Sequence, residues 1–330
     1  MPRTGPNEAG PKDAAPETGR AAGPSPRRAR GRAPLAAGFA LLPAVLLAAA
    51  GCAADAAPAR PAAPLLPLAA AEERVLARAE QVLIARCLHR RGFAYVAHVP
   101  QDAAPARRFP YVIDDPAWAR AHGFGTDRQR RIAALKAADP NERYFRGLPP
   151  RRRQAALAAL HGPRPVGLSA RVPGGGVATA SDEGCTAEAQ RGLYGDLPGW
   201  FTAKLTVANL TPLYVPRVRE DPRYRRAEAA WGRCMAARGH RHATPDELRR
   251  ALPRLVHGLP AGPARAEETR LAVAEADCAR SSGLGATATA LDREYGAGVR
   301  HRYRAAIVTE LRLQRAALPT ARRILSGEPA

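Results

Sequence analysis

The chain reads Arg86-Cys87-Leu88-His89-Arg90-Arg91-Gly92 at residues 86–92 and Arg233-Cys234-Met235-Ala236-Ala237-Arg238-Gly239 at residues 233–239. Both segments follow the pattern R-C-[LM]-x-x-R-G. Before each cysteine, small and apolar residues recur at the spacing of one helix face. The closing glycine suits the left-handed conformation that often ends a helix. The repeat therefore predicts two similar helices, each with a cysteine near its C-terminal end.

Two further cysteines also lie in similar surroundings. Cys185 follows Asp182-Glu183-Gly184, Cys278 follows Glu275-Ala276-Asp277, and a Gly-Leu pair comes after each cysteine. Four cysteines allow three pairings, and the internal similarity favours a duplication with one disulfide in each copy, Cys87–Cys185 and Cys234–Cys278. Closing loops of these lengths would stabilise each copy by about 4–5 kcal/mol in the chain-entropy model. The alternative is four buried free thiols.

Most of the remaining chain favours helices. Asp115, Asp139 and Asp221 each precede a proline, and Thr244-Pro245-Asp246-Glu247 is a capping box, so helices are expected to begin at these four places. Further helices are expected over residues 71–91, 126–138, 149–160, 264–281 and 287–317, the last broken near Gly296 and Gly298, and from a Ser181 cap to residue 194. Residues 197–209 also suit a helix, although Thr206 and Val207 suit a strand.

Two stretches are expected to lack helix. Residues 161–176 are rich in proline and glycine and predict a loop. Residues 93–113 predict a loop or short strand whose apolar side chains pack inward: Phe93, Tyr95, Val96, Tyr111 and Val112. The predicted fold is mainly α, with two disulfide-stapled helical repeats, residues 71–212 and 213–330, packed together and little or no sheet.

The N-terminal region has the order of an export signal. Arginines cluster up to Arg32, an uncharged stretch runs from residue 33 to residue 54, and small residues follow the apolar segment. Ala49-Ala50-Gly51-Cys52 resembles a lipobox, in which the cysteine thiol is acylated and becomes the new N-terminus. Ala49 stands where leucine is usual. We therefore expect residues 1–51 to be a signal peptide and Cys52 to be lipidated, with residues 52–70 as lipid anchor and flexible tether.

Two alternatives to lipidation remain open at this point. One is an ordinary secreted protein, and the other is an uncleaved membrane anchor, because the uncharged stretch is long enough to span a bilayer. Under the lipoprotein interpretation, Cys52 also accounts for the odd count of five cysteines.

The net charge of +21 raises the question of nucleic-acid binding. Only Lys12, Lys136 and Lys204 are lysines, so nearly all the basic residues are arginine. A strong preference for arginine, with abundant alanine, proline and glycine, is typical of a GC-rich genome. We expect no nucleic-acid partner and instead a solvated surface or contact with anionic lipid or wall polymer, with Arg128, Arg130 and Arg131 beside residues 151–153 as the candidate patch.

The sequence contains no recognisable catalytic set. Its histidines are scattered, and the one group, His240, His242 and His257, lacks a further ligand at metal-site spacing. No serine lies in a Gly-x-Ser-x-Gly or Ser-x-x-Lys motif. The paired carboxylates lie where helices are expected to start, at 114–115, 139 with 142, 220–221 and 267–268. We therefore predict no catalytic, metal or cofactor site.

Five motifs of the chain together resemble a group of uncharacterised actinobacterial exported lipoproteins. They are the lipobox-like ending, R-C-[LM]-x-x-R-G-F-x-Y, residues 111–115, Glu183-Gly184-Cys185 and Trp231-Gly232-Arg233-Cys234-Met235. The resemblance covers roughly residues 40–317, and Leu88 stands where methionine is usual. It implies the outer face of the cell membrane and disulfides, without a chemistry. We expect a membrane-anchored, non-enzymatic binding or accessory protein of the cell envelope, with an envelope protein or anionic wall polymer as partner. The alternative is an envelope hydrolase with a dispersed catalytic dyad.

Overall fold

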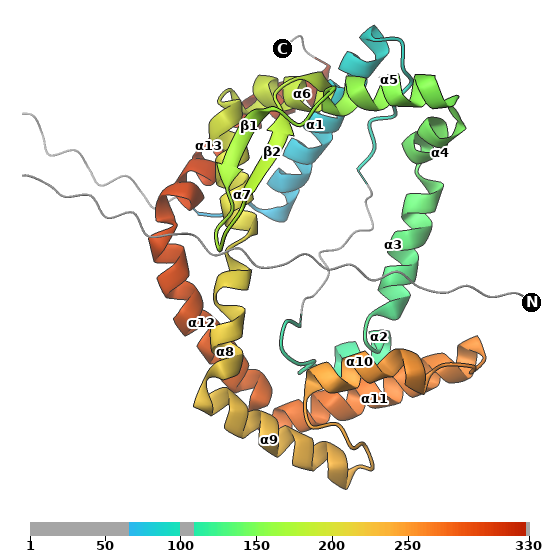
Figure 1. Cartoon of the computed structure of the whole chain (residues 1–330), viewed down its shortest axis with the longest axis vertical. Helices are drawn as coiled ribbons and strands as arrows, with labels where there is room; N and C mark the ends of the chain where they lie inside the picture. Colours follow the sequence, from blue (N-terminus) through green and yellow to red (C-terminus); the bar gives the residue numbers. More distant parts are fainter. Residues whose placement is uncertain (1–65, 100–108, 328–330) are drawn as a thin grey trace, which may run out of the picture. The chain divides into compact units, whose positions relative to one another are not determined.

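The computed structural model describes residues 66–99 and 109–327 of the chain. Within these residues the protein is mainly α-helical, with one two-stranded sheet, as predicted (Figure 1). The helices are α1 (Ala70–Arg90), α2 (Pro116–His122), α3 (Thr126–Ala138), α4 (Pro140–Gly147), α5 (Pro150–His161), α6 (Gly184–Tyr194), α7 (Leu197–Ala208), α8 (Val215–Glu220), α9 (Pro222–Ala237), α10 (Pro245–Leu255), α11 (Ala261–Ser281), α12 (Leu284–Arg302) and α13 (Arg304–Ser326), with a short 3-10 helix η1 (Thr211–Leu213).

The four predicted helix starts are confirmed. The side chains of Asp115, Asp139, Asp221 and Thr244 each accept a hydrogen bond from a backbone N–H two or three residues further along the chain. In each case the next residue is the proline that occupies the first helical position, where its missing N–H costs nothing. These four local sequences therefore determine where α2, α4, α9 and α10 begin.

The two copies of R-C-[LM]-x-x-R-G end their helices in the same way. In the first copy the N–H of Phe93 donates to the carbonyl of Leu88 at 2.9 Å, and in the second the N–H of His240 donates to the carbonyl of Met235 at 2.9 Å. The glycine of each copy has a positive φ, 77° and 85°. This is the Schellman arrangement, which satisfies the last carbonyl groups of a helix. Leu88 and Met235 are both fully buried.

One hydrophobic core forms around α1, α6, α7 and α13, which pack against one another although α13 is last in the chain (Figure 1). Its members include Leu76, Leu193, Trp200 and Leu318. Tyr194 stacks on Trp200 with ring centroids 3.7 Å apart. A neighbouring cluster around the first disulfide joins α5 to α1 and α6. We call the buried side chains that α1, α5, α6, α7 and α13 contribute to these two clusters the first core.

A second core forms from α8, α9, α11 and α12, with α10 contributing Leu248 and Leu252. Trp231, Leu271 and Leu284 are its large buried side chains. The loop before α2 supplies Tyr111 and Val112 to this core, and α2 itself packs on α11. Packing thus does not follow the order of the two expected repeats, because each core draws on both halves of the chain.

A β-hairpin occupies part of the segment for which we predicted a loop. Strands β1 (Gly167–Arg171) and β2 (Val177–Ser181) pair antiparallel, with Leu168 opposite Ala180. Leu168 and Ala170 point inward, and β1 packs on α7. The strands are five residues long with small side chains, so the alternation that identifies a strand was too short to detect. Gly174, Gly175 and Gly176 lie in the connection between the two strands.

Three smaller expectations are wrong. Ser181 does not cap a helix: it ends β2, its hydroxyl accepts a hydrogen bond from the N–H of Glu183 at 3.2 Å, and α6 begins three residues later than Ser181. The break in the last helix lies at Tyr303 rather than near Gly296, because α12 continues through both glycines, and the helical segment extends to residue 326. Val96 was expected inside and is 52% exposed.

Candidate functional site

The five predicted site cysteines divide into two groups. Cys52 lies outside the described residues. The other four form the two predicted disulfides, Cys87–Cys185 and Cys234–Cys278, with Cα atoms 5.5 and 5.6 Å apart. This pairing confirms the interpretation from the repeated motif and overturns the alternative of four free thiols. Since the chain has five cysteines, Cys52 alone remains outside these two disulfides.

The first disulfide joins α1 to α6 inside the first core. Both of its cysteines are buried, at 1% and 0% exposure. Glu188, one helical turn after Cys185, forms an ion pair with Arg90 and lies 3.6 Å from Arg91. These pairs are largely exposed and contribute little to stability, so the disulfide and the apolar contacts beneath it hold α1 on α6.

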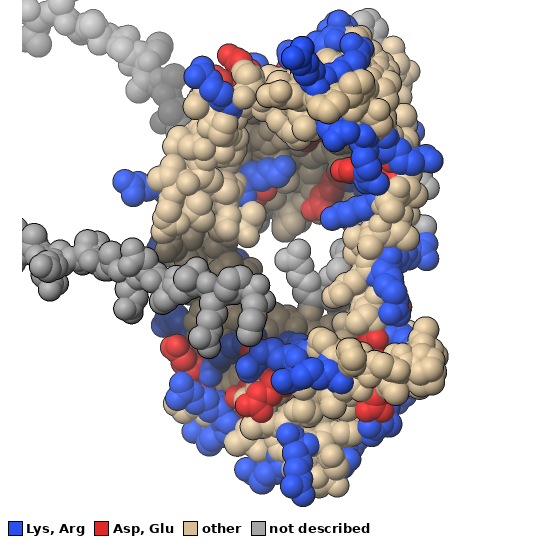
Figure 2. All heavy atoms as spheres, turned by 45° about the vertical axis from the view of Figure 1, so that its right-hand side comes forward, with Lys and Arg blue, Asp and Glu red and all other residues tan. Residues whose placement is uncertain are grey.

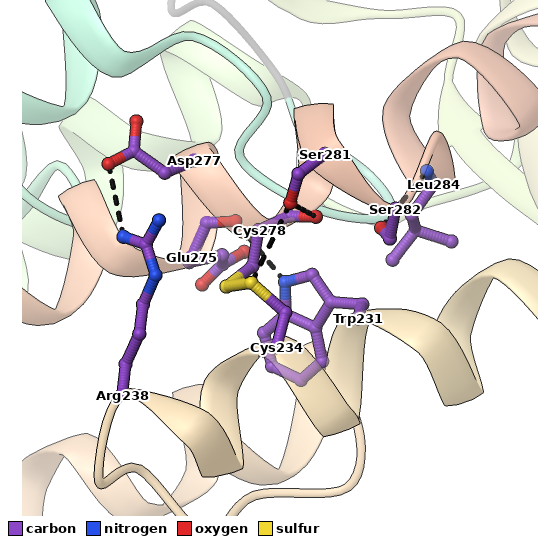
Figure 3. The surroundings of a disulfide bond; sticks show 9 residues. All are labelled: Trp231, Cys234, Arg238, Glu275, Asp277, Cys278, Ser281, Ser282 and Leu284. Atoms are coloured by element: carbon purple, nitrogen blue, oxygen red, sulfur yellow. Dashed lines mark hydrogen bonds and ion pairs between the residues drawn. A yellow bond between two sulfur atoms is a disulfide. The ribbon is translucent and has the colours of Figure 1, made fainter.

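The second disulfide joins α9 to α11, and hydrogen bonds on both sides of it connect the same two segments (Figure 3). One turn before Cys234, the indole N–H of Trp231 donates to the backbone carbonyl of Glu275 at 3.2 Å. One turn after it, Arg238 donates to the carboxylate of Asp277 at 3.1 Å. Trp231, Cys234 and the C-cap residue Arg238 lie along one side of α9, which fixes the register of the two helices.

Glu275 is a buried carboxylate that sequence reasoning missed. It has 0% exposure, and its Oε1 accepts hydrogen bonds from the backbone N–H of Ile113 at 2.8 Å and from Arg249 at 3.3 Å. Burial raises the pKa of Glu275 to about 7, against the lowering effect of Arg249. Its place on the same helix stripe as Leu271 and Cys278 was the available signal.

Glu268 is the other buried carboxylate of α11, and it caps a helix from a distance. Its Oε1 accepts from the N–H of Phe124 at 2.8 Å, and its other oxygen accepts from the hydroxyl of Thr126. Arg265 lies 3.4 Å from the carboxylate. We explained the 267–268 pair by a helix start, which is wrong for Glu268: it lies in the interior of α11 and serves the N-terminus of α3 instead.

A pocket of about 390 Å³ lies between the 109–114 segment and α12. Small residues, Gly285 and Ala288, form part of its wall, and three charged side chains line it: Asp114, Asp292 and Arg293. Tyr111 donates its hydroxyl hydrogen to Asp292 at 2.8 Å. Burial and this carboxylate raise the pKa of Tyr111 far above its usual value, so the phenol stays protonated.

The lining of this pocket determines what it can bind. It presents two carboxylates and one guanidinium beside apolar residues such as Pro110 and Val112. This lining suits a small polar molecule that carries a positive charge, or one positive and one negative charge. Structure thus brings Asp114 and Asp292 together, two carboxylates that the sequence places far apart. Sequence reasoning had no signal for this pocket, because neither residue belongs to a recognisable motif.

His240 belongs to the one group of histidines in the sequence, with His242 and His257. In the structure the guanidinium of Arg270 donates a hydrogen bond to Nε2 of His240 at 3.2 Å, and burial lowers the pKa of His240. Within residues 66–99 and 109–327, no group of three or more His, Cys, Asp or Glu side chains could hold a metal ion. A cationic guanidinium beside His240 also disfavours a metal cation there.

No family model, curated protein or solved structure is similar to this chain. Among the described helices, none combines the length and apolar character needed to cross a membrane.

Proposed function

We propose that the protein is a lipid-anchored lipoprotein on the outer face of the cell membrane with a non-enzymatic binding or accessory role in the envelope. Residues 1–51 would direct export, and the thiol of Cys52 would carry the lipid. The domain from residue 71 onward would stand outside the membrane on the segment 52–70.

The pairing of the cysteines is the observation that supports this proposal most strongly. Both disulfides link helices that pack against each other, and such bonds persist in oxidising compartments outside the cytosol. They account for every cysteine except the one that follows Ala49-Ala50-Gly51. An exported chain with one cysteine left over needs a use for it, and acylation supplies that use.

Labelling cells with a fatty acid tests the proposal. The wild-type protein is expected in the membrane fraction with label and without residues 1–51, and the Cys52→Ser variant is expected to carry no label. As a matched control, the double variant Cys234→Ser/Cys278→Ser should keep its label, because its lipidation cysteine is intact. Unlabelled wild-type protein that retains its leader would refute the proposal, and unlabelled protein released to the medium would support secretion instead.

The pocket beside Tyr111 favours the hydrolase as a second candidate function, because it contains the two carboxylates Asp114 and Asp292. An acid and a base or nucleophile of this kind are the minimal set for glycoside hydrolysis. The test is release of reducing ends from purified cell wall by the wild-type protein. Loss of that release in both Asp114→Asn and Asp292→Asn would support the hydrolase, and no release by the wild type would remove it.

A further inference from the structure

A basic arm extends over α3, α4 and α5, residues 126–161. It contains nine Arg and Lys residues and three Asp and Glu residues. Figure 2 shows these cationic side chains along the forward-facing side of the protein, with few acidic side chains among them. The three acidic residues are each engaged: Asp127 with His122 at 2.9 Å, Asp139 as the cap of α4, and Glu142 with Arg146 at 3.6 Å.

Several cations of the arm have no partner within the part of the chain that the structure describes. Arg130, Lys136, Arg143 and Arg151 are exposed, and no described residue forms a side-chain hydrogen bond or ion pair with them. Arg153, in contrast, donates to three backbone carbonyls between α4 and α5 and belongs to the scaffold. The first four side chains are therefore available to an anionic partner.

The first two helices of the arm contribute little to the cores, although the partly buried Phe145 of α4 packs against the cluster around the first disulfide. Neither α3 nor α4 has a buried residue, and the principal neighbours of α3 are the helices that precede and follow it. A helix of this length is marginally stable without tertiary packing. The N-terminus of α3 is held by Glu268, and Arg130, Ile132 and Lys136 of this helix are exposed.

Two apolar side chains of the arm are also exposed. Ile132 of α3 is 42% exposed and Leu157 of α5 is 44% exposed. A purely electrostatic partner such as a soluble polyanion gains nothing from them, whereas a lipid surface takes up aliphatic side chains at the boundary between headgroups and acyl chains. This combination favours a membrane over a wall polymer.

We propose that the basic arm docks on an anionic phospholipid surface, with Arg130, Lys136, Arg143 and Arg151 at the headgroups and with Ile132 and Leu157 directed toward the acyl region. The nearness of the arm to a membrane rests on the proposed lipid anchor at Cys52. The segment from Cys52 to Leu66 reaches at most about 50 Å, so an anchored domain stays close to the membrane. At such high effective concentration a weak surface attraction is enough to orient the domain.

Vesicle binding by residues 62–330 tests the arm separately from lipidation. These residues form one compact unit that includes both cores and both disulfides, and they lack Cys52. Each basic residue near an anionic surface contributes to binding. The variant Arg130→Gln/Lys136→Gln/Arg143→Gln/Arg151→Gln is therefore expected to bind phosphatidylglycerol-containing vesicles at least about tenfold more weakly than the wild type. Wild-type binding should also fall as salt rises, and it should be absent on phosphatidylcholine alone.

A control variant removes the same charge elsewhere. Arg225, Arg254, Arg302 and Arg304 are exposed and lie outside the arm, and their replacement by glutamine should leave vesicle binding within about twofold of the wild type. Equal losses in the two variants would overturn the proposal, since they would show a response to net charge alone. Thermal unfolding of both variants excludes misfolding as the cause.

The apolar side chains decide between lipid and wall polymer. Ile132→Ser/Leu157→Ser is expected to weaken vesicle binding several-fold, whereas Val177→Ser/Val308→Ser, which alters comparably exposed valines outside the arm, should not. No effect of the first variant, together with equally tight binding of the wild type to soluble polyphosphate, would overturn the membrane assignment. Failure of fatty-acid labelling at Cys52 would refute the anchor and leave these vesicle results standing.

Discussion

Glu275 accepts a hydrogen bond of 2.8 Å from the backbone N–H of Ile113, although 162 residues separate them in the chain. The same carboxylate meets Arg249 of α10 at 3.3 Å. One buried acid in α11 thus joins α10 and the loop before α2 to the second core. Its second oxygen, Oε2, has no hydrogen-bond partner among the described residues, so ionising this group is costly.

Glu275 should make the protein less stable as pH rises toward neutrality. Its pKa is about 7 in the folded protein, against an ordinary value of 4.5. Since the folded pKa is raised, the folded state binds more protons between these values, so the contribution is fully present below about pH 4.5 and is lost as pH rises through about 7. The loss amounts to about 3 kcal/mol.

Urea unfolding between pH 4.5 and pH 7.5 measures this effect. In Glu275→Gln the fall in unfolding free energy over that range should be smaller than in the wild type. Glu183→Gln, an exposed carboxylate at the start of α6, is the control and should keep the wild-type slope. An identical pH dependence in wild type and Glu275→Gln would contradict the assignment.

Removing either disulfide should destabilise the protein by a similar amount. The loops closed by Cys87–Cys185 and Cys234–Cys278 span 98 and 44 residues. The chain-entropy model predicts losses of roughly 4–5 kcal/mol for the double serine variants, larger for the longer loop by less than about 1 kcal/mol. Chemical denaturation without reductant measures both, and intact mass should rise by four hydrogen atoms when the wild type is reduced.

Gly123 should not tolerate alanine. Its φ is +58° and its ψ is −127°, and an added Cβ would lie 2.7 Å from Oε1 of Glu268. The strained backbone alone costs about 1–3 kcal/mol in unfolding free energy. Gly298→Ala is the matched control, because that glycine lies within α12 with open space around it; it should gain about 0.5–1 kcal/mol. Equal effects on the melting temperature would contradict this account.

Glu268 should control the order of the α3 N-terminus. In Glu268→Ala the N–H of Phe124 and the hydroxyl of Thr126 lose their acceptor, and loss of a cap costs about 1 kcal/mol. Hydrogen exchange at residues 124–128 should therefore become roughly five- to tenfold faster. Glu268→Gln keeps an acceptor oxygen and should exchange more slowly than the alanine variant. Unchanged exchange in Glu268→Ala would show that the cap has no energetic role.

Local features of the fold were predictable because a few neighbouring residues determine them. Asp115, Asp139, Asp221 and Thr244 begin helices through hydrogen bonds that span two or three residues. The hairpin at 167–181 was not predicted because its strands are short and because each strand is defined by its pairing with the other. The pocket beside Tyr111 could not be predicted, because Asp114 and Asp292 line it together only through the tertiary packing that places the 109–114 segment beside α12.

The amino-acid sequence by itself determined the helical class, the starts of four helices, the two matching helix ends and, through the repeated motif, which cysteines pair. These features depend on short-range backbone geometry or on an internal duplication, so they can be predicted without knowledge of the tertiary structure. Only the tertiary structure decided that α13 completes the first core, that Glu268 caps α3 and that Glu275 holds Ile113. Those contacts join residues more than a hundred positions apart, and no local pattern encodes which distant surface a buried carboxylate will meet.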